Sequence, residues 1–192
     1  MRRYFNITGT CTPEEDYMVD ISGKLRQIRA MVDRRQYFTI NRGRQYGKTT
    51  TLNALRGQLA DEYICVSISF EGIGNEPFET TESFCQTFLR LFRDALRFSS
   101  IAGDAQYLES WVDTTVLSFE ALSRHITRMC EGKKLVLLID EIDKASNFWI
   151  FINFLAMLRD KFLQRKAGMN YTFHSVILAG VHDIKNIKQK MI

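Results

Sequence analysis

The hydrophobic positions along this chain follow two alternating periodicities. Short apolar or β-branched runs predict four strands, at residues 37–40, 64–70, 135–139 and 175–180. The third run, Leu135 to Ile139, is unbroken and too short for a buried helix, which is typical of a strand covered on both faces. Strands of this kind, separated by helical stretches, predict an α/β fold with a parallel sheet and helices on both faces.

Between the predicted strands, apolar residues recur three and four positions apart, as on one face of a helix. A first helix is expected from Asp20, a good N-cap residue, to about Arg35. The apolar faces of the later helices are Leu52, Leu55 and Leu59; Phe84, Phe88, Leu91 and Ala95; Phe119, Leu122, Ile126 and Met129; and Phe148, Phe151, Ile152, Leu155, Leu158 and Phe162. The phenylalanine stripe is more typical of a core face than of rings that stack on a cofactor.

The segment after the first predicted strand has the form of a phosphate-binding loop. The residues expected to bind the nucleotide are Gly43, Arg44, Gln45, Tyr46, Gly47, Lys48, Thr49 and Thr50. Backbone N–H groups of such a loop, and those at the start of the next helix, favour an anion, and Gly47 lets the backbone approach it closely. Lys48 is expected to contact the β- and γ-phosphates and to assist catalysis, and the Thr49 hydroxyl to bind Mg²⁺.

This loop departs from the general pattern at one position. The form G-x-x-x-x-G-K-[ST] asks for glycine at position 42, where this chain has Arg42, and the nearest glycine is Gly43. The first turn of the loop is therefore expected to be built differently. Gly-Lys-Thr also occurs by chance in basic turns before helices, so the interpretation depends on a partner motif.

Two carboxylates after the third predicted strand supply that partner. Asp140 and Glu141 follow Ile139 at the carboxyl end of the strand, where open α/β sheets bind ligands. Asp140 is expected to hold Mg²⁺, directly or through water, and Glu141 to orient or deprotonate the attacking water. A solvated acidic turn is the alternative for these two residues alone. This strand comes two strands after the one before the loop, which predicts a further strand between them in space.

Length and composition fit one globular domain. The chain has 192 residues, with 45% hydrophobic and 25% charged residues and a net charge of +4. We expect residues 1–36 to form an N-terminal segment and helix, and residues 37–192 to form the core. Basic residues gather in the first quarter and near the last residue: Lys24, Arg26, Arg29, Arg34, Arg35, Arg42, Arg44 and Lys48, then Lys185, Lys188 and Lys190. A solvated helix face with the phosphate loop explains them, and a DNA-binding patch is the alternative.

Cysteine and histidine spacing argues against other classes of site. The four cysteines include no C-x-x-C and the three histidines no H-E-x-x-H, so we expect neither a structural metal site nor a disulfide framework. Free thiols fit a cytoplasmic location, and the N-terminus lacks an apolar signal core. The longest apolar stretch, 148–158, is interrupted by Asn153 and is shorter than the roughly 20 residues that span a bilayer.

Four stretches, in this order, resemble the bacterial and archaeal AAA-like ATPases of the STAND type, including those known as predicted AAA-ATPases. They are Tyr17 to Asp20, Tyr37 to Leu55, Leu135 to Asp143 and Val176 to Lys185. Members of that family carry loops of the form Arg-x-Arg/Gln-x-Gly-Lys-Thr, which accommodates Arg42. The resemblance implies a three-layer P-loop NTPase core of the ASCE/AAA-like kind, ATP and Mg²⁺ as ligands, and hydrolysis coupled to a conformational switch.

The resemblance also implies parts that this sequence does not show. Family members continue past the fourth strand with a fifth strand, a helical lid or winged-helix region and often a nuclease-like domain, whereas this chain ends at Ile192, so a fragment or a truncated product is expected. Near the end of the fourth strand, His182 or Asp183 would sense the γ-phosphate, and a plain turn is the alternative. No arginine finger is identified; Arg159 and Arg165 lie on or near a suitable helix, but surface solvation explains them equally.

Three functions remain open from the sequence. The first is an ATP-hydrolysing conformational switch, with ATP, and a protein partner or a missing C-terminal domain, as partners. The second is a nucleotide-gated binding module with little hydrolysis, and the third is a DNA-associated accessory ATPase linked to a nuclease. Nothing marks a phosphate-acceptor site for a kinase. No Asn-Lys-x-Asp motif is present, which favours adenine over guanine.

Overall fold

The structure, a computed structural model, describes residues 4–5, 15–17, 19–41, 43, 46–99 and 116–181. Its sheet consists of β1 (Tyr37–Asn41), β2 (Ile64–Ser69), β3 (Leu135–Asp140) and β4 (Ser175–Gly180). The strand order is β1-β4-β3-β2, and every neighbouring pair is parallel. β4 therefore lies between β1 and β3, so the sequence prediction of an intervening strand is confirmed.

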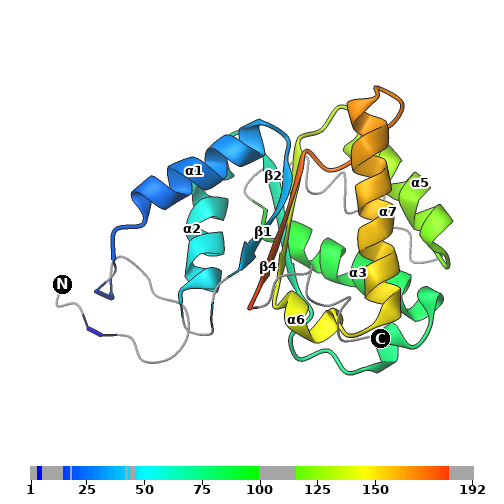
Figure 1. Ribbon diagram of the computed structural model, residues 1–192, viewed down its shortest axis with the longest axis horizontal. Helices are drawn as coiled ribbons and strands as arrows, with labels where there is room; N and C mark the ends of the chain where they lie inside the picture. Colours follow the sequence, from blue (N-terminus) through cyan, green and yellow to red (C-terminus); the bar gives the residue numbers. More distant parts are fainter. Residues whose placement is uncertain are drawn as a thin grey trace.

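One face of the sheet is covered by α1 (Ser22–Asp33) and α2 (Lys48–Leu59), which lie together on one side in Figure 1. Their buried hydrophobic residues are aliphatic and form one core cluster with alternate residues of the strands: Leu25, Ile28, Val32, Leu52, Leu55, Leu59, Val136, Leu138 and Ile177. α1 belongs to the expected N-terminal segment, yet it packs directly on α2. The division of the chain at residue 36 stays a prediction.

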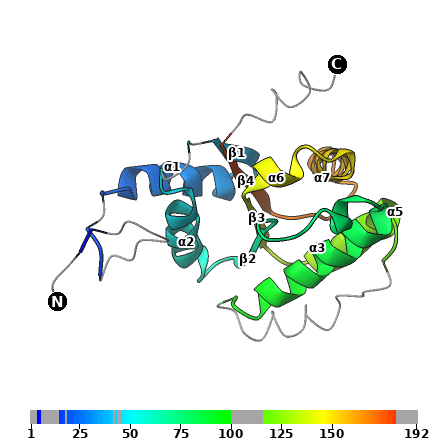
Figure 2. The same cartoon turned by 90° about the horizontal axis from the view of Figure 1, so that it is seen from below.

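The other face carries the remaining elements (Figure 2). These are η1 (Glu76–Phe78), α3 (Thr81–Leu96), α5 (Phe119–Cys130), α6 (Ile142–Ala145) and α7 (Trp149–Lys166). Their core is aromatic, with Phe70, Phe84, Phe88, Phe92, Phe151, Phe154 and Phe173 fully buried. Ring centroids of Phe88 and Phe154 lie 4.8 Å apart, so the phenylalanine stripe is a core face, as predicted.

β3 shows why the sheet needs both layers. All its residues are buried; Leu135, Leu137 and Ile139 join the aromatic cluster, whereas Val136 and Leu138 join the aliphatic one. Successive side chains point to opposite faces, so an unbroken apolar strand must be covered on both sides. The predicted α/β class and three-layer core are confirmed.

Local signals account for several boundaries. Thr80 and Ser118 are the N-caps of α3 and α5, and their hydroxyls accept hydrogen bonds from Ser83 N (3.1 Å) and Ala121 N (3.2 Å). Asp20 accepts from Ser22 N at 2.9 Å, one residue before the N-cap position of α1, which Ile21 takes. η1 and α6 have no counterpart among the predicted helices, because both are too short to show a helical period.

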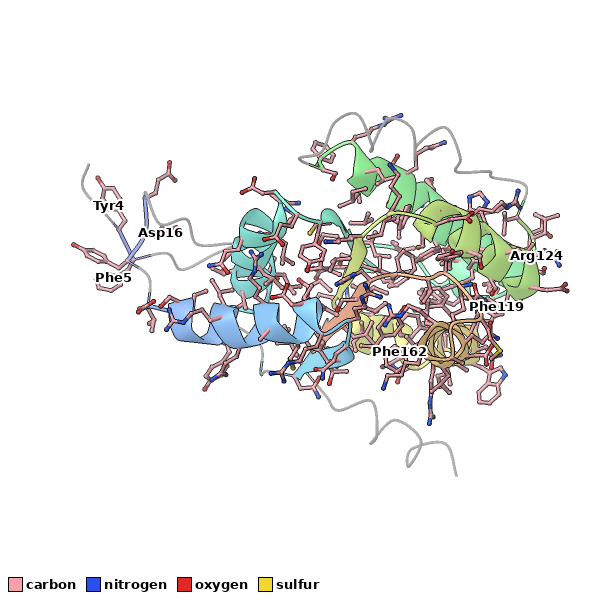
Figure 3. All side chains as sticks on the ribbon, turned by 90° about the horizontal axis from the view of Figure 1, so that it is seen from above. Tyr4, Phe5, Asp16, Phe119, Arg124 and Phe162 are labelled. Carbon is pink, nitrogen blue, oxygen red and sulfur yellow. The ribbon has the colours of Figure 1, made fainter. Side chains whose placement is uncertain are left out.

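The first described residues lie apart from the sheet, and the view with side chains shows Tyr4, Phe5 and Asp16 there (Figure 3). Tyr4 and Asp16 form an isolated bridge, and the rings of Phe5 and Tyr17 lie 4.9 Å apart. Elsewhere in the described ranges, none of the helices combines the length and the apolar character that crossing a bilayer requires.

Candidate functional site

The loop between β1 and α2 ends in a glycine with a left-handed backbone. Gly47 is the N-cap of α2 with φ +68°, and a Cβ at this position would meet no atom within 4 Å. The left-handed backbone favours glycine, and space lies open beside it. Its carbonyl oxygen accepts hydrogen bonds from Thr51 N (2.9 Å) and Thr51 Oγ1 (2.7 Å), which fixes the start of the helix.

The first turn of α2 has the character of an anion site. No side chain caps it and no acidic residue lies in it. The first N–H groups of a helix have no partner within the helix, and the helix dipole adds partial positive charge there. Thr50, half-buried, lies within this turn as predicted.

Lys48 is held close to this loop. Its side chain is buried, at 6% exposure, and its Nζ lies 3.5 Å from the carbonyl oxygen of Gly43. Burying an ammonium is costly unless polar groups surround it. The contact with the Gly43 carbonyl oxygen therefore favours a position of the Lys48 ammonium at the loop. Tyr46 is 71% exposed, and a Cβ on Gly43 would come within 3.1 Å of its ring, a close contact that this exposed side chain can relieve by a small shift. Arg42, Arg44 and Gln45 lie outside the described residues.

The structure brings the phosphate-binding loop and the acidic pair together. Thr49 Oγ1 donates a hydrogen bond to Asp140 Oδ2 at 2.7 Å, although the two residues are far apart in the sequence. Asp140 is buried, and its Oδ1 accepts from Glu141 N at 2.9 Å. Two groups predicted to share one metal ion thus meet at the carboxyl ends of β1 and β3, with β4 between these strands.

Their geometry can be tested against a bound Mg²⁺. Adjacent ligands of an octahedral Mg²⁺, each at 2.0–2.1 Å, are about 2.9 Å apart, which is close to the 2.7 Å between Thr49 Oγ1 and Asp140 Oδ2. No group of three or more His, Cys, Asp or Glu side chains within the described residues is arranged to hold a metal. One carboxylate and one hydroxyl suit Mg²⁺, which commonly takes its remaining ligands from water and phosphate.

Glu141 is held in an uncommon backbone conformation. Its φ is +53° and its ψ +45°, in the left-handed region, which costs a residue with a Cβ on the order of 1 kcal/mol. Strain of this kind persists where the surrounding structure enforces it, often at functional sites. The left-handed backbone of Glu141 lies directly between the end of β3 and the start of α6. The Glu141 side chain is half-buried, next to Asp140 in the chain.

A third carboxylate, to which the sequence analysis gave no role, joins the segment after β3 to the end of β4. Asp143 Oδ2 accepts a hydrogen bond from Val181 N at 2.6 Å, and Asp143 O accepts from Ser146 Oγ at 2.8 Å. A Cβ on Gly180 would lie 2.7 Å from Ile142 Cγ1 and 3.0 Å from Asp143 Oδ2, so β4 must end in glycine. The spacing of three residues from Asp140 was the available signal for Asp143, but spacing alone does not reveal the contact with β4.

The remaining predicted residues divide into two groups. His182 and Asp183, considered as γ-phosphate sensors, lie outside the described residues. Arg165, considered as an arginine finger or a solvated residue, is instead half-buried and donates hydrogen bonds to the carbonyl oxygens of His174 (2.9 Å) and Arg35 (2.6 Å), at the opposite edge of the sheet. Arg159 is exposed and lines an apolar groove between β1 and α7.

Comparisons with known proteins agree with this architecture. No functionally curated protein matches the chain in sequence. Nine chains of solved structures match it, among them the ORC2 protein of Aeropyrum pernix, solved as ADPNP–ADP complexes. That match has a TM-score of 0.54 and 11% sequence identity, and covers 90% of this chain and 44% of the ORC2 chain. At this identity the likeness shows a shared fold, and this chain spans less than half of that protein.

The model of the family described as AAA domain matches residues 44–187, a stretch that runs from the phosphate-binding loop past the acidic pair to the end of β4. The chain therefore belongs to the AAA domain family of nucleotide-binding P-loop ATPases.

Proposed function

We propose that this domain binds ATP with Mg²⁺ and hydrolyses it slowly, and that hydrolysis changes the conformation of the segments after β3 and β4. The observation that carries the proposal is the hydrogen bond between Thr49 Oγ1 and Asp140 Oδ2. It joins two motifs, each weak alone, at the edge where parallel α/β sheets bind their ligands.

Each residue has one task in this proposal. Lys48 and the first-turn amides of α2 bind the phosphates and offset their charge. Thr49 and Asp140 hold Mg²⁺, which would neutralise charge that develops between the β- and γ-phosphates. Glu141 accepts a hydrogen bond from the attacking water and takes its proton, and its fixed backbone keeps the carboxylate beside Asp140. Gly43, Arg44, Gln45 and Tyr46 form the rest of the loop around the phosphates, and Thr50 supports the first turn.

The conformational step rests on the contact of Asp143 with β4. Glu141 and Asp143 lie on one short segment, and Asp143 holds Val181 N at the end of the central strand. A displacement of Glu141 when the γ-phosphate leaves would therefore shift the end of β4. Asp143 acts here as a positioning residue, because it works through β4 rather than on ATP.

The test measures binding and turnover on the same protein samples. Labelled ATP is titrated in the presence of Mg²⁺, and phosphate release is followed in parallel, for the wild type and for Glu141→Gln. The variant keeps the shape and hydrogen-bonding capacity of the side chain but cannot take a proton, so we expect unchanged ATP binding and phosphate release reduced about a hundredfold or more. Arg90→Ala, an exposed change on α3, is the control for general damage.

The results separate the alternatives. Equal phosphate release by the wild type and Glu141→Gln would refute the role of Glu141. ATP binding by the wild type without any phosphate release would instead support a nucleotide-gated module. The absence of ATP binding would refute the proposal as a whole.

A further inference from the structure

A polar hollow lies at the other edge of the sheet. It is a cleft of about 770 Å³, and its lining comes from the turns before β1, β3 and β4 and from α5 and α7. These turns precede the strands that carry the nucleotide site at their carboxyl ends, so the cleft and the nucleotide site are on opposite edges. The lining and charge of this cleft are independent of the function proposed for the nucleotide site.

Positive charge dominates the lining of this cleft. The charged residues are Arg35, Lys133, Lys134 and Arg165 against the single carboxylate of Glu131. Within the described ranges, no ion pair involves Arg35, Lys134 or Arg165. Charges of one sign in a concave surface reinforce one another, and they raise the local concentration of an oppositely charged ligand.

Arg165 is fixed in place before any ligand arrives. Its guanidinium donates to the carbonyl oxygens of Phe173 and His174, which precede β4, and to that of Arg35, which precedes β1. The rings of Tyr37 and Phe162 each lie 5.3 Å from the guanidinium carbon. A rigid cation loses little conformational entropy on binding a ligand, which favours affinity.

A further cation lies behind the wall of the cleft. Lys161, only 1% exposed, donates from Nζ to Thr127 Oγ1 (2.7 Å) and Ser123 O (2.9 Å), with Asn170 Oδ1 at 3.4 Å. Thr127 and Asn170 also line the cleft. The ammonium is bound by neutral oxygen atoms only, so its charge is not cancelled locally and adds to the positive potential of the wall.

His174 is affected by the positive charges of the same cleft. It is nine-tenths buried in the wall of the cleft, and its Nε2 has no hydrogen-bond partner within the described residues. Burial, together with the charges of Arg35, Arg165 and Lys134, lowers the pKa of His174 to about 4. The imidazole is therefore uncharged at neutral pH, and it contributes a polar group rather than a further charge.

From this lining we propose that the cleft binds a small anion with several charges, of the class of pyrophosphates and phosphate esters. The volume lies in the range of roughly 300–1,000 Å³ typical of small-molecule sites. Cationic residues of α7 and of the turns before β1 and β3 line one hollow, as suits a compact anion; a nucleic-acid strand would need cations spread along a track.

The experiment uses pyrophosphate as the probe. Because the phosphate-binding loop would also take pyrophosphate, the titration is made by calorimetry in a Lys48→Ala background. We expect binding at one site, and we expect it to weaken about tenfold in Lys134→Gln, since one charge-assisted contact is removed. Lys134→Arg keeps the charge and should retain binding, and Arg90→Ala, an exposed change on α3 outside the cleft, should have no effect.

A second readout locates the site independently. Backbone amide signals of Thr172 and Lys134 should shift on addition of pyrophosphate, whereas that of Arg90 should not. Three results would overturn the proposal: no binding in the Lys48→Ala background, equal weakening in Lys134→Gln and Arg90→Ala, or a single-stranded oligonucleotide binding there more tightly than pyrophosphate with steep salt dependence. The last result would assign the cleft to nucleic acid.

Discussion

Each edge of the sheet holds one residue other than glycine in the left-handed backbone region. Glu141 (φ +53°) follows β3 at the carboxyl edge, and Arg35 (φ +58°) precedes β1 at the amino edge. Within the described residues these are the only two such positions. Both turn the chain sharply where it enters or leaves a strand, and both carry a charged side chain.

The two edges differ in the charges that they gather. The carboxyl edge combines Lys48 with the carboxylates of Asp140, Glu141 and Asp143, which suits a metal ion bound together with phosphates. The amino edge gathers cations against one carboxylate, which suits an anion without a metal. In these proposals one parallel sheet would provide two anion sites, and the connecting turns would set the chemistry of each.

Among the variants that distinguish the two edges of the sheet, Lys48→Ala should have the largest effect on ligand binding. Removing a buried ammonium from the loop should weaken ATP binding about ten- to a hundredfold, because a hydrogen bond to a charged group contributes about 1.5–3 kcal/mol. The cleft at the amino edge should still bind pyrophosphate. Calorimetry with each ligand measures both, and retained ATP affinity would break the assignment of the carboxyl edge.

At the amino edge, His174 should make the free energy of unfolding depend on pH. Burial lowers the pKa of His174 from 6.5 to about 4, so between these values the unfolded chain binds a proton that the folded protein does not. The contribution of His174 to the free energy of unfolding, on the order of 3 kcal/mol, is therefore fully present above pH about 6.5. It is lost as the pH falls towards 4.

Urea titrations at several pH values test this dependence. His174→Gln removes the titrating ring, so its unfolding free energy should fall less over the same interval. If wild type and variant lose stability in parallel, the titration of another group is responsible. A weaker fall in the presence of pyrophosphate would tie His174 to the proposed cleft, because a bound anion favours the protonated ring.

At the carboxyl edge, Gly180→Ala tests the contact between β4 and α6. The new Cβ would lie 2.7 Å from Ile142 Cγ1, and such overpacking should lower the unfolding free energy by about 2 kcal/mol. In an Ile142→Ala background the same change should cost less, which a double-mutant cycle measures. Gly57→Ala is the matched control: no atom lies within 4 Å of its added Cβ, so a gain of about 1 kcal/mol in helix α2 is expected.

The fold could be predicted largely from periodicity because its strands are short and fully buried. Leu135 to Ile139 has no polar residue, and the helices between strands show clear apolar stripes. The short elements η1 and α6 escaped prediction, since neither makes enough turns for a stripe to appear. Motif order predicted a strand between β1 and β3, but no local signal in the sequence identified that strand as β4.

The site was predictable where its chemistry is local in sequence. Lys48 and Thr49 are adjacent, as are Asp140 and Glu141, so each pair forms a recognisable motif. The cleft at the amino edge is different, because its cations come from α7 and from two turns that only the fold brings together. The same holds for Arg165, whose role as a donor to strand-entry carbonyl groups is not encoded near it in sequence.

The smallest expected effect compares the two left-handed residues directly, through Arg35→Gly and Glu141→Gly. Glycine removes a backbone strain of about 1 kcal/mol but raises the entropy of the unfolded chain, so each variant should gain about 0.5 kcal/mol in unfolding free energy. Urea titration measures this gain. Glu141→Gly should also lose phosphate release while it gains stability, and Arg35→Gly should weaken pyrophosphate binding in the cleft. A loss of stability at one edge only would mean that its side chain contributes to folding, and the two turns would then not be equivalent. Equal gains with separate losses of function would show that each edge keeps a strained residue for the ligand that it binds.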